Sequence, residues 1–278
     1  MAGGQRLGRV VVAVKQVPDT TQVRVDPETG TLIREGVPFI VNPFDTHAVE
    51  EALRLKDRFG CPVTVLTMGP PNSVAALRKC LALGADEAVL ISDRAFGGAD
   101  TLATSYVLSA AIRTLEQERG RVDLVFCGKQ TIDGDTAQVG PGIATRLGWS
   151  QLTLVDRVQE VDSARRTVTV RRKLERRKET VRAPLPAVLA VVREINHPRY
   201  PAVAARLDAE GAPVETWTNA ELRLPEERLG LKGSPTNVKR IFAPQRTRGE
   251  ILGGEDQDPD AVVQELIRKL IERDLLVV

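Results

Sequence analysis

The stretch VDLVFCGKQTIDGDTAQVGPGIATRL, residues 122–147, passes from an apolar run through a polar loop into a helix pattern. The run at 122–127 predicts a buried β-strand, and residues 138–147 predict a short helix. Glycines in the loop between them permit a close approach of the backbone to a neighbour. A strand that leads through such a loop into a helix is half of a βαβ unit, so this stretch predicts an α/β fold.

The same alternation of strand and helix patterns precedes this stretch. The strand patterns cover residues 10–14, 62–68 and 88–91, and the helix patterns follow residues 42–46, end at Leu83 and span 100–118. Short apolar strands separated by helices predict a mainly parallel sheet with helices on both faces. Ligands of such sheets lie beyond the carboxyl ends of the strands, so the loops of interest follow Val14, Met68 and Cys127.

A basic segment follows the first 150 residues. Residues 155–161 and 167–173 predict a hairpin joined around Asp162, and residues 184–192 return to an apolar strand that completes the sheet. Nine Arg and Lys side chains between residues 165 and 182 make the hairpin basic. A solvated hairpin is the preferred interpretation, and a surface for an anionic partner or a nucleic acid is the alternative.

The chain changes character again at residue 213, where Pro, Gly and charged residues become frequent. Residues 229–254 read as an extended arm with little core of its own. Residues 259–273 predict a helix with one strongly apolar face, which needs a partner surface. A tight turn is also expected at residues 26–30, from the sequence DPETG.

Composition excludes several classes of protein. The 278 residues carry a net charge of +2 and only 4% aromatic residues, which argues against a nucleic-acid-coating protein. Three Cys without a C-x-x-C spacing predict reduced core thiols, and two His are too few for a His-based metal site. The absence of a long apolar run and of a signal-peptide profile predicts a cytoplasmic protein without membrane insertion.

The loop at residues 128–141 carries the chemistry. Free N–H groups at the start of the following helix can bind phosphate, and Thr136 and Gln138 add polar side chains. Asp133 and Asp135 are poor neighbours of a phosphate unless they cap backbone donors or bind ribose hydroxyls. The loop is neither a Walker A sequence nor a G-x-G-x-x-G sequence. A capped turn without a ligand explains the residues of this loop equally well.

Several separate stretches, in the same order, resemble the beta subunit of electron-transfer flavoproteins. They are VAVKQVPD at 12–19, VNPFDTHAVEEA at 41–52, LALGAD at 81–86, GKQTIDGDTAQVG at 128–140, LPA at 185–187 and NHPRY at 196–200. The resemblance covers roughly residues 9 to 201, and PQRT at 244–247 is similar to the family's C-terminal arm.

The resemblance implies an adenine-nucleotide-binding (HUP-like) α/β fold over residues 1–212, with the hairpin inserted at about 155–182. Residues 213–278 would form an arm and helix that wrap a partner alpha subunit. The resemblance implies, for a classical heterodimer, one FAD mainly on alpha and AMP buried in beta. A bifurcating branch, associated with NADH oxidation and low-potential acceptors, holds a second FAD where AMP would lie. The small Gly134 and Ala137 favour FAD at this site, with AMP as the alternative.

The resemblance also maps the family's nucleotide contacts onto this chain. The residues are Ala13, Asn42, Pro43, Phe44, Asp45, Met68, Gly128, Lys129, Gln130, Thr131, Asp133, Gly134, Asp135, Thr136, Ala137, Gln138, Val139 and Gly140. Loop N–H groups with Thr136 and Gln138 would hold the pyrophosphate. Asn42 and Asp45 would approach the adenosine, and Ala13 would line the adenine slot together with Met68.

The family's docking loop for acyl-CoA dehydrogenases matches residues 201–213, where Val203 or Leu207 would be the apolar anchor. The family's lysine cluster is missing there, which favours a quinone- or ferredoxin-linked oxidoreductase as the partner. Arg199 is expected to form a surface salt bridge, with a contact to flavin or to the subunit boundary as the alternative. His47 is expected to be structural.

Two other function classes compete with an electron carrier. An adenylate-transferring or ATP-hydrolysing enzyme of this fold needs a pyrophosphate loop after the first strand, and residues 15–21 contain no glycine. An RNA-binding scaffold would use the basic hairpin, and the scarcity of aromatic residues argues against it.

Overall fold

The computed structural model describes residues 6–19, 24–25, 32–33, 38–237, 249–254 and 258–276. The turn expected at 26–30 and the family-like stretch at 244–247 lie outside these residues.

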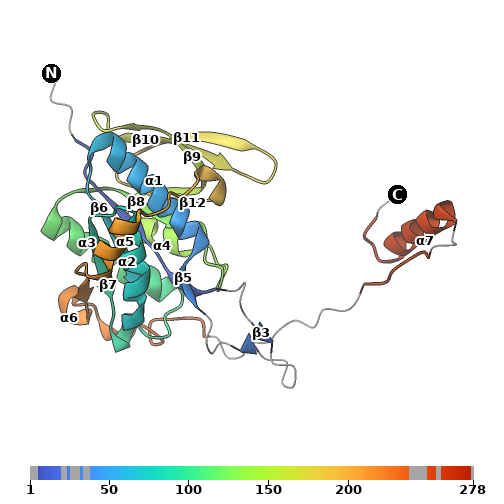
Figure 1. The fold of residues 1–278 in the computed structure, drawn as a ribbon, viewed down its shortest axis with the longest axis horizontal. Helices are drawn as coiled ribbons and strands as arrows, with labels where there is room; N and C mark the ends of the chain where they lie inside the picture. Colours follow the sequence, from blue (N-terminus) through green and yellow to red (C-terminus); the bar gives the residue numbers. More distant parts are fainter. Residues whose placement is uncertain are drawn as a thin grey trace.

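Nine of the described strands form one sheet, in the order β11-β10-β9-β12-β8-β1-β6-β7-β13 (Figure 1). Its parallel part contains β1 (Arg9–Ala13), β6 (Val63–Met68), β7 (Glu87–Ile91), β8 (Val122–Gly128), β12 (Ala187–Val191) and β13 (Glu215–Trp217). Strand β9 (Ser150–Asp162) pairs parallel with β12, and β10 (Thr167–Lys173) and β11 (Lys178–Pro184) then continue the sheet in antiparallel pairing. The predicted α/β fold with a largely parallel sheet is confirmed.

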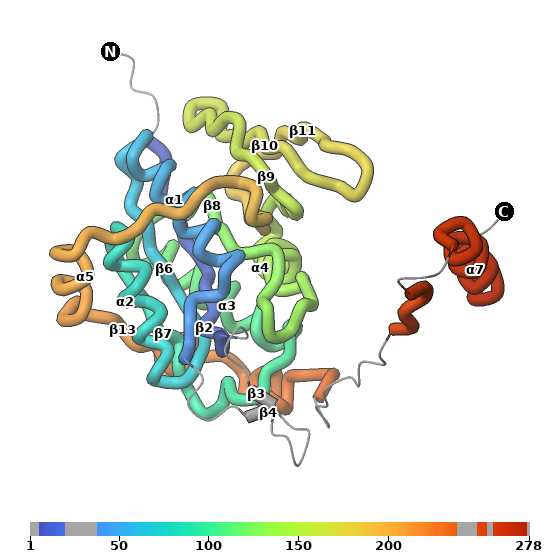
Figure 2. Tube along the Cα trace, turned by 45° about the vertical axis from the view of Figure 1, so that its right-hand side comes forward, coloured from blue at the N-terminus to red at the C-terminus, as the bar shows by residue number. Residues whose placement is uncertain are grey.

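Helices cover both faces of the sheet. The described helices of the body are α1 (Pro43–Phe59), α2 (Val74–Leu83), α3 (Thr101–Arg119), α4 (Val139–Leu147), α5 (Val203–Glu210) and α6 (Asn219–Leu222). Shorter 3-10 turns are η2 (Pro71–Ser73), η3 (Arg94–Phe96), η4 (Arg193–Ile195) and η5 (Glu226–Arg228). After β12 the chain crosses α1 and reaches α5, which packs beside α2 (Figure 2).

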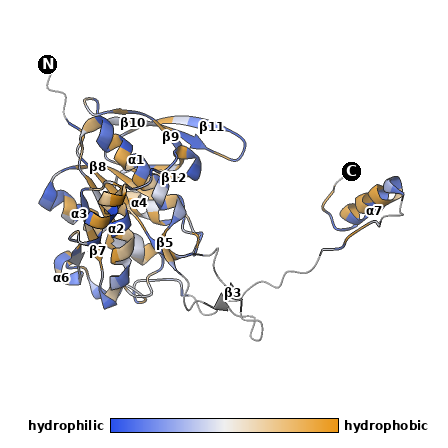
Figure 3. Cartoon of the chain, viewed as in Figure 1, coloured by the Kyte–Doolittle hydropathy of each residue, from blue (hydrophilic) through white to orange (hydrophobic). Residues whose placement is uncertain are grey.

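The two faces have separate cores, because successive side chains of a strand point to opposite sides. Val10 and Val12 of β1 join the core under α1 and α2, whereas Val11 and Ala13 join the core under α3 and α4. Figure 3 shows the hydrophobic colouring of the central strands. Strands buried on both faces explain the unbroken apolar runs in the sequence.

Helix α1 begins within the stretch 42–46, as its sequence predicts. Asn42 precedes the helix and Pro43 occupies its first position, where the missing N–H of proline costs no hydrogen bond. The helix ends at Gly60, whose φ of 64° places it in the left-handed region that glycine adopts without strain.

The basic segment is a three-stranded antiparallel extension rather than a two-stranded hairpin. Its turn lies at Asp162, as predicted, where the side-chain Oδ1 accepts a hydrogen bond from Arg165 N–H at 2.8 Å. Most of the cations pair with carboxylates of the same extension or its neighbours. These pairs are Arg166–Asp123, Arg171–Asp156, Arg172–Glu179, Lys173–Glu194, Arg177–Glu179, Lys178–Asp156 and Arg182–Glu160.

The α/β body continues past residue 212, so the arm begins later than the expected boundary. Strand β13 pairs with β7 at one edge of the sheet, and Trp217 and Leu229 are buried in the core under α3. Helix α7 (Pro259–Glu272) has its predicted amphipathic pattern and buries none of its residues. It stands apart from the body and carries an apolar stripe (Figures 1 and 3).

Two small antiparallel pairs lie before α1 in the sequence. Strand β2 (Gln16–Pro18) pairs with β5 (Phe39–Val41), and β3 (Arg24–Val25) pairs with β4 (Leu32–Ile33). Within the described part of the chain, none of the helices combines the length and the apolar character needed to cross a bilayer.

Candidate functional site

A large cleft opens at the carboxyl ends of β1, β6, β7 and β8. Its volume is about 1480 Å³, and its walls come from the loops that follow these four strands. The apolar part includes Ala13, Met68, Phe96 and Leu108. This is the edge at which α/β sheets of this type bind their ligands.

Asp45, in the first turn of α1, joins two of these loops. Its Oδ2 accepts a hydrogen bond from the main-chain N–H of Lys15 at 2.8 Å, and its Oδ1 accepts one from Gly128 N–H at 2.9 Å. The side chain is only 4% exposed, so the carboxylate is a buried brace. It fixes the backbone that follows β1 against the backbone that follows β8.

Burial raises the pKa of Asp45 from 3.8 to about 7. The main-chain N–H groups of Lys15 and Gly128 and the side chain of Asn42 act in the opposite direction, because they stabilise the carboxylate. Burial is the larger effect. Asp45 therefore changes its protonation near neutral pH.

Asn42 holds the other end of the loop after β8. Its Nδ2 donates to the carbonyl oxygen of Gln130 at 2.9 Å, and its Oδ1 accepts from Ile132 N–H at 3.2 Å. The residue is fully buried. Because both ends of its amide are used by the loop backbone, Asn42 supports the loop from behind instead of lining the cleft.

The two acidic residues of the loop are both engaged by neighbouring side chains. Asp133 forms an ion pair with Lys15 Nζ at 2.8 Å, and the pKa of Asp133 is lowered by this partner despite its partial burial. Asp135 Oδ1 accepts from Gln130 Nε2 at 2.6 Å. Asp135 and Ala137 have φ angles of 52° and 57°, which turn the chain sharply before α4. The carboxylates thus shape the loop.

The first turn of α4 presents unpaired backbone donors to the cleft. Among the described residues, nothing accepts a hydrogen bond from the N–H of Val139 or Gly140, and Gln138 makes no side-chain cap. The side chain of Gln138 accepts instead from the Thr101 hydroxyl at 3.0 Å, which links the starts of α3 and α4. A Cβ on Gly140 would lie 2.7 Å from Cys127 Sγ, so glycine lets α4 begin directly against β8.

Two cations of the cleft lack a carboxylate partner within the described parts of the chain. They are Lys129 and Arg94, which come from opposite walls. The acidic lining residues Asp45, Asp93 and Asp100 all accept main-chain N–H groups. These contacts engage the carboxylate oxygens, but the pKa of Asp93 and of Asp100 is lowered, so both remain ionised. In the described chain, Lys129 and Arg94 are the lining cations that are free to pair with an anionic group.

The structure brings most of the predicted ligand contacts together in this one cleft. Those that line it are Ala13, Asp45, Met68, Gly128, Lys129, Gln130, Thr131, Gly134, Thr136, Ala137, Gln138, Val139 and Gly140. Those that stand outside its lining are Asn42, Pro43, Phe44, Asp133 and Asp135. The latter support the loop or the start of α1.

The wall between β7 and α3 was missed in the sequence. Residues 92–94 and 96–102 line the cleft, as do Pro235 and Thr236 from the C-terminal segment. Residues 69–71 also line it, and they belong to the loop after Met68 that the sequence pattern had indicated. The sequence could have indicated the residues that follow β7, because Ile91 ends a parallel strand at the same edge of the sheet as Met68 and Cys127. Pro235 and Thr236 carried no signal, since their position depends on distant contacts.

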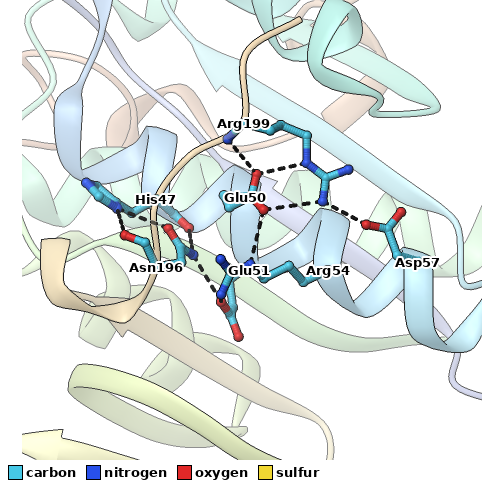
Figure 4. A network of polar contacts seen from close by, with 7 residues as sticks. All are labelled: His47, Glu50, Glu51, Arg54, Asp57, Asn196 and Arg199. Carbon is cyan, nitrogen blue, oxygen red and sulfur yellow. Dashed lines mark hydrogen bonds and ion pairs between the residues drawn. The ribbon is translucent and has the colours of Figure 1, made fainter.

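A second polar network lies outside the cleft, between α1 and residues 196–199 (Figure 4). Arg199 binds both oxygens of Glu50, at 2.9 and 3.3 Å, and Asp57 at 2.7 Å. His47 Nδ1 lies 3.0 Å from Asn196 Oδ1. The expected salt bridge of Arg199 is confirmed, and the contact of His47 with Asn196 agrees with the expected structural role.

The residues that follow the network of Figure 4 along the chain lie at the surface. Tyr200 is 95% exposed, and Val203 and Leu207 on α5 are 76% and 63% exposed. Tyr200, Val203 and Leu207 thus form a short exposed apolar surface that follows Arg199 in the chain. The two residues proposed as docking anchors both belong to it.

Comparison with known proteins gives a consistent result. The family model described as "Electron transfer flavoprotein domain" matches residues 29–222. The chain is 48% identical over 263 residues to Protein FixA of Azotobacter vinelandii, covering 94% of this chain and 93% of that protein. It is 50% identical over 244 residues to the electron transfer flavoprotein subunit beta of Clostridium acetobutylicum, covering 87% and 91%. It is 46% identical over 270 residues to the caffeyl-CoA reductase-Etf complex subunit CarD of Acetobacterium woodii, covering 96% and 100%.

Proposed function

The chain belongs to the electron transfer flavoprotein family, and from this premise we propose that it is a beta subunit that binds FAD in the cleft. Together with an alpha subunit it passes electrons between a donor and an acceptor protein. The observation that carries the proposal is the convergence of free N–H groups at the start of α4 with the unpaired cations Lys129 and Arg94. Both suit a pyrophosphate group.

The residues of the cleft fit a dinucleotide in shape as well as in charge. Ligand pockets usually measure about 300–1,000 Å³, so a cleft of about 1480 Å³ has room for a dinucleotide. The missing Cβ atoms of Gly128 and Gly140 allow the loop and α4 to approach β8 closely. The apolar side chains of Ala13 and Met68 offer a slot for a flat aromatic ring.

Each part of the chain has a separate task in this proposal. The loop and the N-terminus of α4 bind the phosphates, while Asp45 and Asn42 keep that loop in register with β1. FAD, when bound, supplies the redox chemistry, and the protein orients it and excludes water from it. Thr136 and Gln138 stand at the point where the loop meets the helix and add polar groups there.

We assign the chain to the bifurcating branch of the family, with NADH as the electron donor. Two observations support this assignment: the small residues Gly134 and Ala137 in the loop, and the similarity to a subunit of a caffeyl-CoA reductase-Etf complex. The partners are the alpha subunit and an acyl-CoA dehydrogenase or a quinone- or ferredoxin-linked oxidoreductase. The complex works in the cytoplasm. A non-bifurcating beta subunit with AMP in the same cleft is the alternative.

Cofactor counting tests the proposal. The chain is purified together with its alpha subunit and denatured, and the released FAD and AMP are measured per heterodimer. Two FAD molecules per heterodimer are expected, whereas one FAD with one AMP would support the alternative. Release of one FAD without AMP would leave the beta subunit without a nucleotide and overturn the proposal. Repeating the count with the Gly128→Ala variant assigns any loss of nucleotide to this cleft.

A further inference from the structure

The C-terminal segment contributes a wall to the cleft, although it comes from more than a hundred residues beyond the first loops. Pro235 and Thr236 line the cleft directly. The segment leaves the core at Leu229, which is 2% exposed. At Gly230 it passes so close to the loop before α3 that a Cβ would lie 2.4 Å from the carbonyl oxygen of Ala95. We call residues 230–236 the strap.

Asp100 fastens this strap. Its Oδ1 accepts hydrogen bonds from Leu102 and Ala103 N–H, at 2.9 and 3.1 Å, and so caps α3. Its Oδ2 accepts from the N–H and the hydroxyl of Thr236, at 3.1 and 2.9 Å. Its own N–H donates to Ser234 Oγ at 2.8 Å. Asp100 therefore caps helix α3 with one carboxylate oxygen and binds the strap with the other.

The remaining contacts of the strap fold it into a turn. The Ser234 hydroxyl donates to the carbonyl oxygen of Gly230 at 2.6 Å, which closes the turn. Leu231 covers Gly98, where a Cβ would meet its side chain at 2.6 Å. Yet Leu231 remains 58% exposed, so apolar burial alone gives this turn little support. The hydrogen bonds of Asp100 are the main contacts between the end of the strap and the α/β body.

We infer that Asp100 is a positioning residue for the nucleotide, and that it acts by holding the strap as a wall of the cleft. The inference rests on the proposed nucleotide site and adds a closing element to it. A nucleotide in the cleft lies between the start of α4 and the strap, so release of the strap opens a path for the nucleotide to leave. Loss of the anchor should therefore raise the dissociation rate more than it lowers the association rate.

The chain offers variants that separate the two tasks of Asp100. Asp100→Asn keeps an oxygen for the cap of α3, since Asn is as good an N-cap as Asp, but places an NH₂ group against the Thr236 N–H. Ser234→Ala combined with Thr236→Val removes the side-chain contacts from the strap and leaves Asp100 intact. Thr236→Ser is the conservative variant, because it retains the hydroxyl. Asp258→Asn, at the start of α7, is the matched control for the exchange itself.

The experiment measures nucleotide release from the purified complex with the alpha subunit, with FAD and AMP as the probes. We expect Asp100→Asn and the Ser234/Thr236 double variant to raise the dissociation rate about tenfold, which corresponds to the loss of one or two hydrogen bonds. Asp258→Asn should match the wild type, and Thr236→Ser, which keeps the hydroxyl, should release nucleotide more slowly than the double variant. Hydrogen exchange of residues 230–236 should slow when nucleotide is added to the wild type, and should not slow in Asp100→Asn.

The outcomes separate this inference from the proposed function. If the wild type binds neither FAD nor AMP in this subunit, the proposed function fails. If it binds one of them and both anchor variants, folded, release it at the wild-type rate, the strap has no role in retention and only this inference is overturned. If both anchor variants lose thermal stability and nucleotide together, unchanged exchange of 230–236 on adding nucleotide to the wild type would also overturn it.

Discussion

The carboxylate of Asp45 accepts the main-chain N–H of Gly128 at 2.9 Å, and a Cβ on Gly128 would lie 2.4 Å from the same oxygen. The contact therefore exists only because residue 128 has no side chain. It sets the distance between the start of α1 and the end of β8, and with it the position from which the whole phosphate-binding loop departs.

Gly128→Ala should consequently damage the site, because the new methyl group would also approach Phe44 Cβ to 2.5 Å. We expect a loss of about 1–3 kcal/mol in the free energy of unfolding, as for other overpacked positions. Nucleotide affinity should fall at least about tenfold, since the loop must move. Denaturant titration and equilibrium nucleotide binding measure the two effects.

Gly134→Ala is the matched control in the same loop. A Cβ there would meet only Thr131 Oγ1, at an ordinary 3.4 Å, and Gly134 does not have a positive φ. Its free energy of unfolding should remain near that of the wild type. Equal effects of the two alanines would show that the contact with Asp45 has no special importance.

Asp45 should make stability depend on pH in an uncommon direction for a carboxyl group. Its pKa of about 7 in the folded chain lies above its ordinary value of 3.8, so between these values the folded chain holds a proton that the unfolded chain has released. The contribution of Asp45 to stability therefore falls as pH rises from about 4 to 7, and is level above that range. The full change is about 4 kcal/mol.

Asp45→Asn removes this titration. The difference in unfolding free energy between wild type and variant, measured by urea titration at several pH values, should favour the wild type less as pH rises from 4 to 7. A difference that is constant over this interval would contradict the raised pKa. The variant should also bind nucleotide more weakly at every pH. Its NH₂ group cannot accept a hydrogen bond, so it loses the contact with the main-chain N–H of either Lys15 or Gly128.

Asn42→Ala should loosen the loop from behind. It leaves Gln130 C=O and Ile132 N–H without their buried partner, which costs about 1–3 kcal/mol. Urea titration measures the loss, and Asn72→Ala at an exposed position is the control. Wild-type stability in Asn42→Ala would mean that the loop backbone finds other partners.

Arg199→Ala should release residues 196–200 from α1. Glu50, almost buried, loses one of its two cationic partners, and a loss of about 1–2 kcal/mol is expected. Arg199→Lys should restore little of it, because lysine cannot bind both oxygens of Glu50 in the same geometry. Hydrogen exchange of residues 196–200 reports the release, with Arg58→Ala, at an exposed position of the same helix, as the control. Protection unchanged in Arg199→Ala would exclude this role.

Sequence patterns predicted the elements that form through local periodicity. The strands that contain Val10, Val65 and Phe126 are buried on both faces and read as apolar runs, and α1 follows the spacing of its apolar residues. Strand β13 escaped detection because three residues, ETW, are too few for a pattern. It is a strand because it pairs with β7.

The candidate site, too, has parts that local sequence patterns predicted and parts that they did not. The sequence predicted the loop at 128–140, because the loop contains glycines and follows a strand. The brace of Asp45, the support by Asn42 and the anchor of Asp100 join residues that lie 83, 90 and 136 positions apart. No local pattern specifies such pairs, and only the packing of the helices around the sheet brings them within hydrogen-bonding distance.

The two borders of the large sheet differ, and each avoids a hazard of open sheets. Strand β11 is long, but it presents Lys178, Glu179 and Arg182 and ends in Pro184, which cannot donate to another strand. Strand β13 is only three residues long. Neither border of this sheet is a long, flat apolar edge, so folded copies of the chain should have little tendency to join sheet to sheet.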